Sequence, residues 1–346
     1  MYWTPVDLRI RSHLSSGTGK TALLVSIICR HLLESKKMGE RRRLIVCAPT
    51  NKAITVVCER FLSVMRLNDN FDVQALLIGD DDKIMDGEKA KGFGGPHDLQ
   101  SVFMYTWTRT IADGYSQLLM AIKKTSKKVK ADELVKLSGE LQKRLDKVPE
   151  GFLLKSSTSE INKILAIRKK SERKKSKTNL IYLLKDVVES IHQMSSKDVF
   201  KSLIKSSDVI FSTLSSAGIS ALKKSAITVH DLIVDEAAAS TEPELYIPFH
   251  LHPKRLLVIG DPRQLPPTVM SRRATTLKLS MSLHERLMDH NKWKPVMLTK
   301  QYRMKPEIRQ FPSEAFYDGQ LKDGENVERY VGTSPMEKYV YLVAVF

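Results

Sequence analysis

Short runs of mostly apolar residues alternate along the chain with longer segments in which apolar residues recur every three or four positions. The short runs are residues 44–48, 73–78, 208–211, 231–234 and 256–259. Apolar runs of this length are typical of strands buried on both faces of a parallel sheet, and the periodic segments are typical of helices that cover such a sheet. The pattern therefore predicts an α/β protein built on a parallel sheet.

Two of the periodic segments lie between predicted strands, at residues 21–35 and 54–65. Between residues 80 and 205 the strand-like runs stop, and only the helical spacing of apolar residues continues. We interpret residues 1–79 and 206–296 as the two parts of one α/β domain. Residues 80–205 are then a helical insertion between them.

Acidic residues follow two of the predicted strands directly. Asp235 and Glu236 come after the run at 231–234, and Asp261 comes after the run at 256–259. The carboxyl ends of parallel strands share one edge of a sheet, and ligands bind at that edge. One carboxylate of an adjacent pair can hold Mg²⁺ while the other takes a proton from attacking water. Such a pair is also common in surface turns, so its meaning depends on a phosphate site elsewhere in the chain.

A candidate phosphate site is the segment Gly-Thr-Gly-Lys-Thr, which leads into a helical apolar pattern. Glycines allow consecutive backbone N–H groups to surround phosphate oxygens, and the helix start adds the positive end of its dipole. Lys20 would reach the β- and γ-phosphates, and the Thr21 hydroxyl would reach Mg²⁺. The predicted nucleotide-binding residues are Gly17, Thr18, Gly19, Lys20 and Thr21.

The phosphate-loop match is incomplete at its start. The full pattern has a glycine where this chain has Leu14, and Ser15 and Ser16 follow it. Read alone, the segment is also compatible with a glycine-rich turn that caps an ordinary helix, although the phosphate loop is the favoured reading. The other segments of the chain decide between these readings.

Five short segments occur in an order that is found in a known enzyme family. They are Gly-Thr-Gly-Lys-Thr at 17–21, Ala-Pro-Thr-Asn-Lys-Ala at 48–53, Asp-Glu-Ala at 235–237, Gly-Asp-Pro-Arg-Gln-Leu-Pro-Pro-Thr-Val at 260–269 and Gln-Tyr-Arg-Met at 301–304. Together they resemble the superfamily 1 helicases, and the nearest branch holds senataxin and the nonsense-mediated-decay helicase. The resemblance implies a RecA-like P-loop NTPase domain that uses ATP and Mg²⁺. It also implies that residues 297–346 begin a second, truncated RecA-like domain.

The resemblance assigns roles to individual residues. Glu236 would be the general base, Gln264 would bond both the γ-phosphate and the attacking water, and Arg303 would be an arginine finger. Asp235 and Thr21 would hold Mg²⁺. The residues expected to contact the nucleic-acid backbone are Pro49, Thr50, Asn51, Ser212 and Thr213. On local sequence alone, Asn51 is equally compatible with an ordinary helix cap.

The net charge of the chain is +17, and most of the excess lies in the predicted insertion. Residues 121–205 hold 22 Lys or Arg against 10 Asp or Glu, and the run at 168–177 is the densest part. A solvated face, a nuclear import signal and a contact with nucleic acid are all compatible with such a run. The run favours the nucleus over the cytoplasm, and the charge favours a polyanionic partner.

The remaining composition restricts the compartment. The three cysteines, Cys29, Cys47 and Cys58, lie in apolar runs without close pairs, which is typical of reduced thiols in the cytosol or nucleus. The sequence has no run of 18 apolar residues, so we expect no membrane partner. These observations agree with a nucleic-acid-binding protein and do not identify the nucleic acid.

The leading hypothesis is an ATP-dependent helicase module that translocates on single-stranded RNA or DNA, 5′ to 3′ by resemblance. The alternative is a non-catalytic fragment or degenerate relative that binds nucleic acid and nucleotide without turnover. A small-molecule kinase is disfavoured by the segments at 264–267 and 301–304. The 346 residues contain neither the family's upstream adenine-binding glutamine nor its later motifs. We therefore expect an incomplete module with low ATPase activity on its own.

Overall fold

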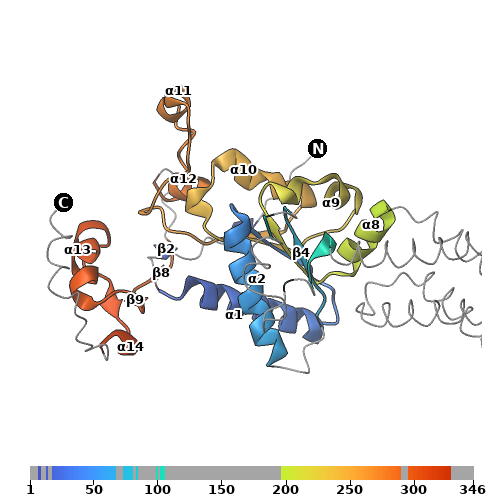
Figure 1. Ribbon diagram of the computed structural model, residues 1–346, viewed down its shortest axis with the longest axis horizontal. Coiled ribbons are helices and arrows are strands. Elements are labelled where there is room, and N and C mark those ends of the chain that lie inside the picture. Colours follow the sequence, from blue (N-terminus) through green and yellow to red (C-terminus); the bar gives the residue numbers. More distant parts are fainter. Residues whose placement is uncertain are drawn as a thin grey trace, which may run out of the picture.

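The computed structural model describes residues 7–8, 13–14, 18–67, 73–80, 83–84, 99, 102–105, 196–289 and 295–328. A six-stranded parallel sheet, in the order β1-β7-β6-β3-β5-β4, forms its centre (Figure 1). Its strands are β1 (Asp7–Leu8), β3 (Leu44–Ala48), β4 (Ala75–Ile78), β5 (Val209–Thr213), β6 (Asp231–Val234) and β7 (Arg255–Val258). The parallel sheet confirms the predicted α/β fold.

The strand register aligns the carboxyl ends of the central strands. Ala48 at the end of β3 pairs with Thr213 at the end of β5, and Val234 at the end of β6 pairs with Val258 of β7. Every residue that follows these strands is therefore delivered to one edge of the sheet. This edge is where the sequence predicted the site.

Two helices cover one face of the sheet. They are α1 (Lys20–Lys37) and α2 (Asn51–Arg66), and both extend a few residues beyond the predicted ranges. Their buried side chains pack against every second residue of the central strands, such as Val46 and Phe211. This alternation is expected for strands buried on both faces, because successive side chains point to opposite sides.

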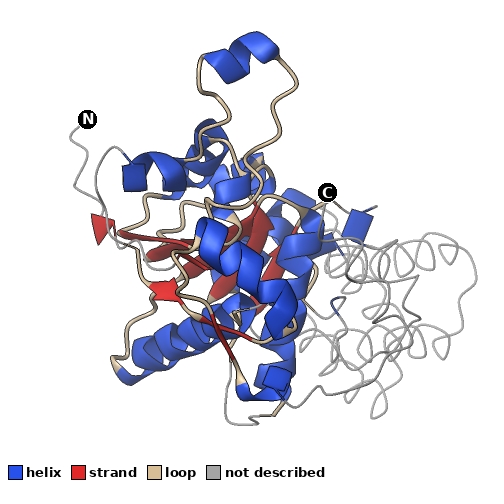
Figure 2. Cartoon of the chain, turned by 90° about the vertical axis from the view of Figure 1, so that its left-hand side faces the viewer, coloured by secondary structure: helices blue, strands red, loops and turns tan. Residues whose placement is uncertain are grey.

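A second layer of shorter helices covers the other face, where Ile45 and Leu232 lie in a separate buried cluster. These elements are α8 (Ser196–Ser206), η3 (Ser216–Gly218), α9 (Ser220–Lys224), η4 (Ala237–Ala239), α10 (Glu242–Tyr246), η5 (Ile247–Leu251) and α12 (Leu283–Asp289). The result is a three-layer arrangement of helices, sheet and helices, with one cluster of apolar side chains on each face (Figure 2). It is the arrangement expected of a RecA-like domain.

The elements outside the central layers are small. The helix α11 (Arg272–Thr276) projects from the body on a long loop (Figures 1 and 2). After it come β8 (Met297–Leu298), β9 (Lys300–Gln301), α13 (Pro306–Phe316), β10 (Lys322–Asp323) and α14 (Glu325–Glu328). The strand β2 (His13–Leu14) pairs in parallel with β8, and β10 pairs in parallel with β9.

Part of the predicted insertion belongs to the α/β domain instead. Leu99 and residues 102–105 return to the edge of the sheet, where the Leu77 backbone N–H donates to the Val102 carbonyl at 2.7 Å. Phe103 and Met104 are fully buried there. Apart from residues 80 and 83–84, the rest of the insertion up to residue 195, including the basic run at 168–177, lies outside the described residues. Its helical nature therefore stays a prediction.

The described residues before the phosphate loop form two short strands, β1 and β2. Each has two residues, and the two join different sheets. Within the described part of the chain, no helix has the length and apolar character needed to cross a membrane.

Candidate functional site

The predicted phosphate loop leads into α1 through a glycine in the left-handed conformation. Gly19 is the N-cap of α1 with φ of 81°, a backbone angle that side chains with a Cβ rarely adopt. Thr18 is buried, with 4% of its surface exposed, and Lys20 and Thr21 form the first turn of the helix. Gly17 lies outside the described residues. The unsatisfied N–H groups of this first turn suit an anion.

Asp235 and Glu236 leave the end of β6 in different environments. Asp235 is buried, and its backbone N–H donates to the Cys47 carbonyl at 2.8 Å. Glu236 adopts a left-handed backbone with φ of 50°, and 40% of its side chain is exposed. The Ala237 backbone N–H donates to the Ile259 carbonyl at 2.9 Å, which holds this strained turn against β7. The turn therefore places the two carboxylates in different surroundings.

An ion pair joins the two predicted motifs. The Lys20 ammonium lies 3.1 Å from a carboxylate oxygen of Glu236. Only 13% of the Lys20 side chain is exposed, so the pair is partly shielded from water. A nucleotide phosphate that recruits Lys20 would compete with Glu236 for the ammonium, and Glu236 would then be released to accept a proton.

Burial raises the pKa of Asp235 to about 6, and the nearby charge of Glu236 adds to this effect. Its Oδ1 atom is buried and has no hydrogen-bond partner among the described residues. A carboxylate oxygen in this state suits Mg²⁺, and the Thr21 hydroxyl stays the predicted second protein ligand. The described residues hold no cluster of three or more acidic, histidine or cysteine side chains suited to a metal. Mg²⁺ bound to phosphates needs only one or two carboxylates.

Gln264 is held beside the sheet edge by Asp261. The Gln264 side-chain amide donates to Asp261 Oδ2 at 2.7 Å, and the Tyr317 hydroxyl donates to the same oxygen at 2.7 Å. Asp261 itself is buried, with 1% exposed. The sequence singled out Gln264, whereas the roles of Asp261 and Tyr317 as its neighbours emerge only from the structure.

Gln301 organises the turn that presents Arg303. Its side-chain oxygen accepts from the backbone N–H groups of Arg303 at 2.9 Å and of Met304 at 2.7 Å. Gln301 is fully buried, whereas Arg303 is exposed on the turn. The sequence predicted a role for Arg303, and the structure adds that Gln301 fixes the backbone before it.

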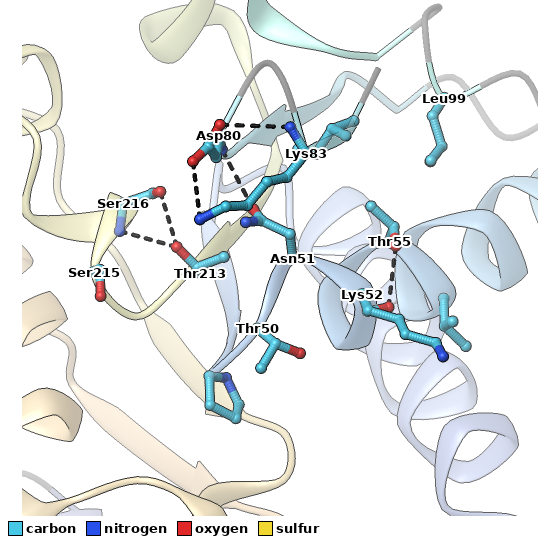
Figure 3. Close-up of a pocket in the computed structure, with 13 residues that line it drawn as sticks. Thr50, Asn51, Lys52, Thr55, Asp80, Lys83, Leu99, Thr213, Ser215 and Ser216 are labelled. Atoms are coloured by element: carbon cyan, nitrogen blue, oxygen red, sulfur yellow. Dashed lines mark hydrogen bonds and ion pairs between the residues drawn. The ribbon is translucent and has the colours of Figure 1, made fainter. Parts of the chain in front are cut away.

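A cleft of about 880 Å³ lies at the same edge, next to the ends of β3 and β5 (Figure 3). Four of the residues predicted to bind nucleic acid line it, together with serines, lysines and a few apolar side chains. They are Pro49, Thr50, Asn51 and Thr213. The structure thus brings these four residues together in one concave surface.

The helix cap beside the cleft is Thr50 and not Asn51. The Ala53 backbone N–H donates to the Thr50 hydroxyl oxygen at 3.2 Å, so the alternative of an Asn51 cap is wrong. The Asn51 side-chain oxygen instead accepts from the Asp80 backbone N–H at 3.3 Å. This contact leaves the amide nitrogen of Asn51 as its donor group at the cleft (Figure 3).

Ser212 does not line the cleft. Its side chain is fully buried, and its hydroxyl donates to the Thr213 carbonyl at 3.0 Å. The alternation of side chains along β5 sends Ser212 and Thr213 to opposite faces, and Thr213 is the one that lines the cleft. Ser215 and Ser216 line the cleft in its place, although the sequence reasoning did not select them. The Thr213 hydroxyl bonds that of Ser216 at 2.8 Å.

Two lysines also missed by the sequence reasoning line the cleft. Lys52 is exposed in the first turn of α2. Lys83 Nζ lies 3.2 Å from a carboxylate oxygen of Asp80, its neighbour at the cleft (Figure 3). Lys52 is part of the segment 48–53, so the sequence carried a signal for it. Lys83 carried none, because its position depends on how the chain turns after β4.

Comparison with known proteins gives matches over most of the chain. The AAA domain family matches residues 13–272, and a second AAA domain family matches residues 279–343. Helicase sen1 of Schizosaccharomyces pombe is 28% identical over 338 residues, which cover 90% of this chain and 19% of that protein. Helicase SEN1 of Saccharomyces cerevisiae is 28% identical over 344 residues, covering 90% of this chain and 14% of that protein.

A shorter part of the chain has a higher identity. The Regulator of nonsense transcripts 1 homolog of Drosophila melanogaster is 43% identical over 122 residues, or 35% of this chain and 10% of that protein. In each case the chain spans less than a fifth of the length of the curated relative. The similarity therefore concerns one part of each of these proteins.

Proposed function

This chain belongs to the AAA domain family, within the superfamily 1 helicases of the senataxin and nonsense-mediated-decay branch, and from this premise we propose that it hydrolyses ATP to move along single-stranded nucleic acid. One observation carries the proposal. The ion pair of 3.1 Å between Lys20 and Glu236 brings the phosphate loop and the acidic pair together. The cleft formed by the other motifs opens at the same edge of the sheet.

The nucleotide would bind at the start of α1. Lys20 and the N–H groups of the first helical turn attract the phosphates, and Glu236 accepts the proton of the attacking water. Asp235 and Thr21 would hold Mg²⁺, which neutralises charge on the phosphates and orients them. Gln264 would bond the γ-phosphate after leaving Asp261. Arg303 would add positive charge from the segment that follows β9.

The cleft would bind the backbone of a single strand. The Asn51 amide, the Thr213 and Ser216 hydroxyls and the Lys52 ammonium are donors that suit phosphate oxygens and sugars. Such donors do not read bases, so RNA and DNA share this chemistry. RNA is the proposed substrate, because one of the named relatives is a regulator of nonsense transcripts. The proposed direction, 5′ to 3′, is carried over from the family resemblance.

The described residues form one complete α/β sheet with a short segment after it. Movement along a strand in this family requires closure between two RecA-like domains, and residues 297–346 would contribute the beginning of the second one. The chain spans 19% and 14% of the two helicases that it matches over 90% of its own length. We propose that a second RecA-like domain completes the motor and supplies a further arginine.

Steady-state phosphate release tests this proposal. We would measure it with and without single-stranded RNA or DNA, for the chain alone and with a second RecA-like domain supplied. Glu236→Gln serves as the inactive control. An ATP-driven motor is supported if single-stranded nucleic acid raises the rate of phosphate release and Glu236→Gln abolishes this increase. A supplied arginine finger is typically worth about 10³ to 10⁵ in rate, so the chain alone should turn over slowly.

The alternative has a distinct outcome in the same assay. A non-catalytic module would bind nucleotide and a single strand, yet its phosphate release would not exceed that of Glu236→Gln under any condition. Failure of the chain to bind either MgATP or a single strand would contradict both readings.

A further inference from the structure

Tyr317 connects two parts of the chain that lie 56 positions apart in sequence. It stands at the end of α13, with 8% of its surface exposed, and its hydroxyl donates to Asp261 Oδ2 at 2.7 Å. Burial raises the pKa of the Tyr317 hydroxyl well above its usual range, and the bond to Asp261 raises it further. The hydroxyl therefore remains a proton donor at any physiological pH.

The carboxylate oxygens of Asp261 accept hydrogen bonds both from Tyr317 and from the loop after β7. Its Oδ2 accepts from both the Gln264 side-chain amide and the Tyr317 hydroxyl, each at 2.7 Å. Its Oδ1 accepts from the Arg263 backbone N–H at 3.1 Å. If Gln264 turns away, the Tyr317 hydroxyl still donates to Asp261 Oδ2, so this oxygen keeps a hydrogen-bond partner. The link to α13 would thus survive a movement of Gln264.

The end of α13 around Tyr317 is closed by bonds to one buried serine. The backbone N–H groups of Tyr317 and Gly319 donate to the Ser313 carbonyl at 3.1 and 2.9 Å. The Leu321 backbone N–H donates to the Ser313 hydroxyl at 3.2 Å. These bonds fix the position of the Tyr317 ring relative to the helix.

The other end of α13 is joined to the turn that presents Arg303. Arg309 of α13 donates to Asp323 Oδ2 at 2.8 Å, and Gln301 donates to Asp323 Oδ1 at 2.5 Å. Gln301 also fixes the backbone of Arg303. The helix has 11 residues and is roughly 16 Å long, so it forms a short rod with Arg303 near one end and Tyr317 at the other.

We propose that Tyr317 is a positioning residue, which holds α13 and therefore Arg303 against the loop that carries Gln264. When Gln264 turns to a γ-phosphate, Asp261 and Tyr317 pass that change to α13. The proposal rests on the proposed function for its nucleotide-dependent part. The contact itself is a property of the nucleotide-free chain.

Backbone hydrogen exchange of residues 300–321 tests the contact without nucleotide. Tyr317→Phe keeps the buried ring and removes only the hydroxyl, so it should raise exchange in α13 about tenfold, the loss expected for one hydrogen bond to a charged group. Tyr246→Phe is the matched control, because the Tyr246 hydroxyl donates to the Glu242 carboxylate at 3.2 Å within the α/β domain. It should leave exchange in α13 unchanged. Equal exchange in Tyr317→Phe and the wild-type chain would overturn the proposal.

The second readout separates positioning from simple stability. In the wild-type chain, a non-hydrolysable ATP analogue with Mg²⁺ should protect α13 further. In Tyr317→Phe the analogue should bind with an unchanged Kd while the added protection is lost. With a second RecA-like domain supplied, kcat should fall about tenfold, and KM for ATP should stay within twofold of wild type. If the analogue protects α13 in Tyr317→Phe as much as in the wild-type chain, the proposal is also overturned. If the wild-type chain does not bind the analogue, only the proposed function is contradicted.

Discussion

Asp235 and Glu236 are neighbours in the chain, yet folding places their carboxylates in opposite situations. One is buried with an oxygen that lacks a partner among the described residues, and the other is paired with Lys20 at the surface of the site. The left-handed backbone of Glu236 separates them. A strained residue that costs stability persists where function requires it. These features agree with a division between holding Mg²⁺ and accepting a proton.

Replacing Asp235 with Asn should stabilise the nucleotide-free chain. The pKa of Asp235 in the folded chain is about 6, against 3.8 for the free group, so folding disfavours its ionised form. The cost is absent below pH 3.8, grows as the pH rises to about 6 and is complete above it. Asp235→Asn should therefore raise the free energy of unfolding by about 3 kcal/mol at pH 7.5, and by roughly half as much at pH 5. Urea denaturation at both pH values measures this difference.

Asp231, at the opposite edge of the sheet, provides a control with the opposite sign. Burial alone would raise the pKa of Asp231, but the bonds from His31 and Arg255 outweigh it and hold that pKa well below its usual range. His31 Nδ1 lies 2.5 Å from one carboxylate oxygen, and Arg255 Nη2 donates to the same oxygen at 2.7 Å. Asp231→Asn should lower the free energy of unfolding by about 2 kcal/mol. A shift in the same direction for both variants would contradict this account of the two carboxylates.

At the scale of elements, the apolar runs were sufficient to predict the buried strands and the two helices on one face. Long runs and regular spacing are strong local signals, and they predict where β3 and β6 end. In the structure β5 runs two residues further than its predicted run, to Thr213, and β7 ends one residue earlier, at Val258. The short strands β1 and β2 had no such signal, because two residues contain no period. The return of residues 102–105 to the sheet depends on contacts with β4 that the local pattern does not encode.

Lys52, in the first turn of α2, is predicted to contribute to the binding of single-stranded nucleic acid. Lys52→Gln should weaken the binding of a single-stranded oligonucleotide several-fold, because Lys52 is exposed on the cleft and would contact a phosphate. The slope of log affinity against log salt should become shallower by about 0.7. Lys224→Gln is the matched control, since Lys224 is an exposed lysine of α9 that is not among the residues lining the cleft. An equal change of slope in both variants would indicate nonspecific attraction to the basic chain.

At the scale of the whole molecule, one edge of the sheet carries both the nucleotide residues and the cleft. The motifs at 235–237 and 260–269 follow β6 and β7, whereas Thr50 follows β3 and Thr213 is the last residue of β5. Because β6 pairs with β3, the two sites share adjacent strands. The adjacent strands offer a route by which a change at the phosphates would reach the cleft, as the proposed motor would require.

The sequence was sufficient to predict which motifs meet at this edge, because parallel strands deliver their carboxyl ends together. It was not sufficient to predict how side chains pair there. Lys20 and Glu236 are distant in sequence, and so are Asp261 and Tyr317. Such pairs depend on rotamers and on the relative placement of elements. The assignments of Glu236, Gln264 and Arg303 therefore remain predictions that the geometry supports and that experiments must test.

Equilibrium binding of MgATP to the wild-type chain, Lys20→Ala and Glu236→Gln tests the central claim most directly. Lys20→Ala removes the charge that would meet the phosphates, so its affinity should fall by at least about tenfold. Glu236→Gln keeps the shape of the side chain and frees Lys20 from its ion pair at 3.1 Å, so ATP should bind at least as tightly as to the wild type. Equal loss of binding in both variants, or no loss in Lys20→Ala, would contradict the account.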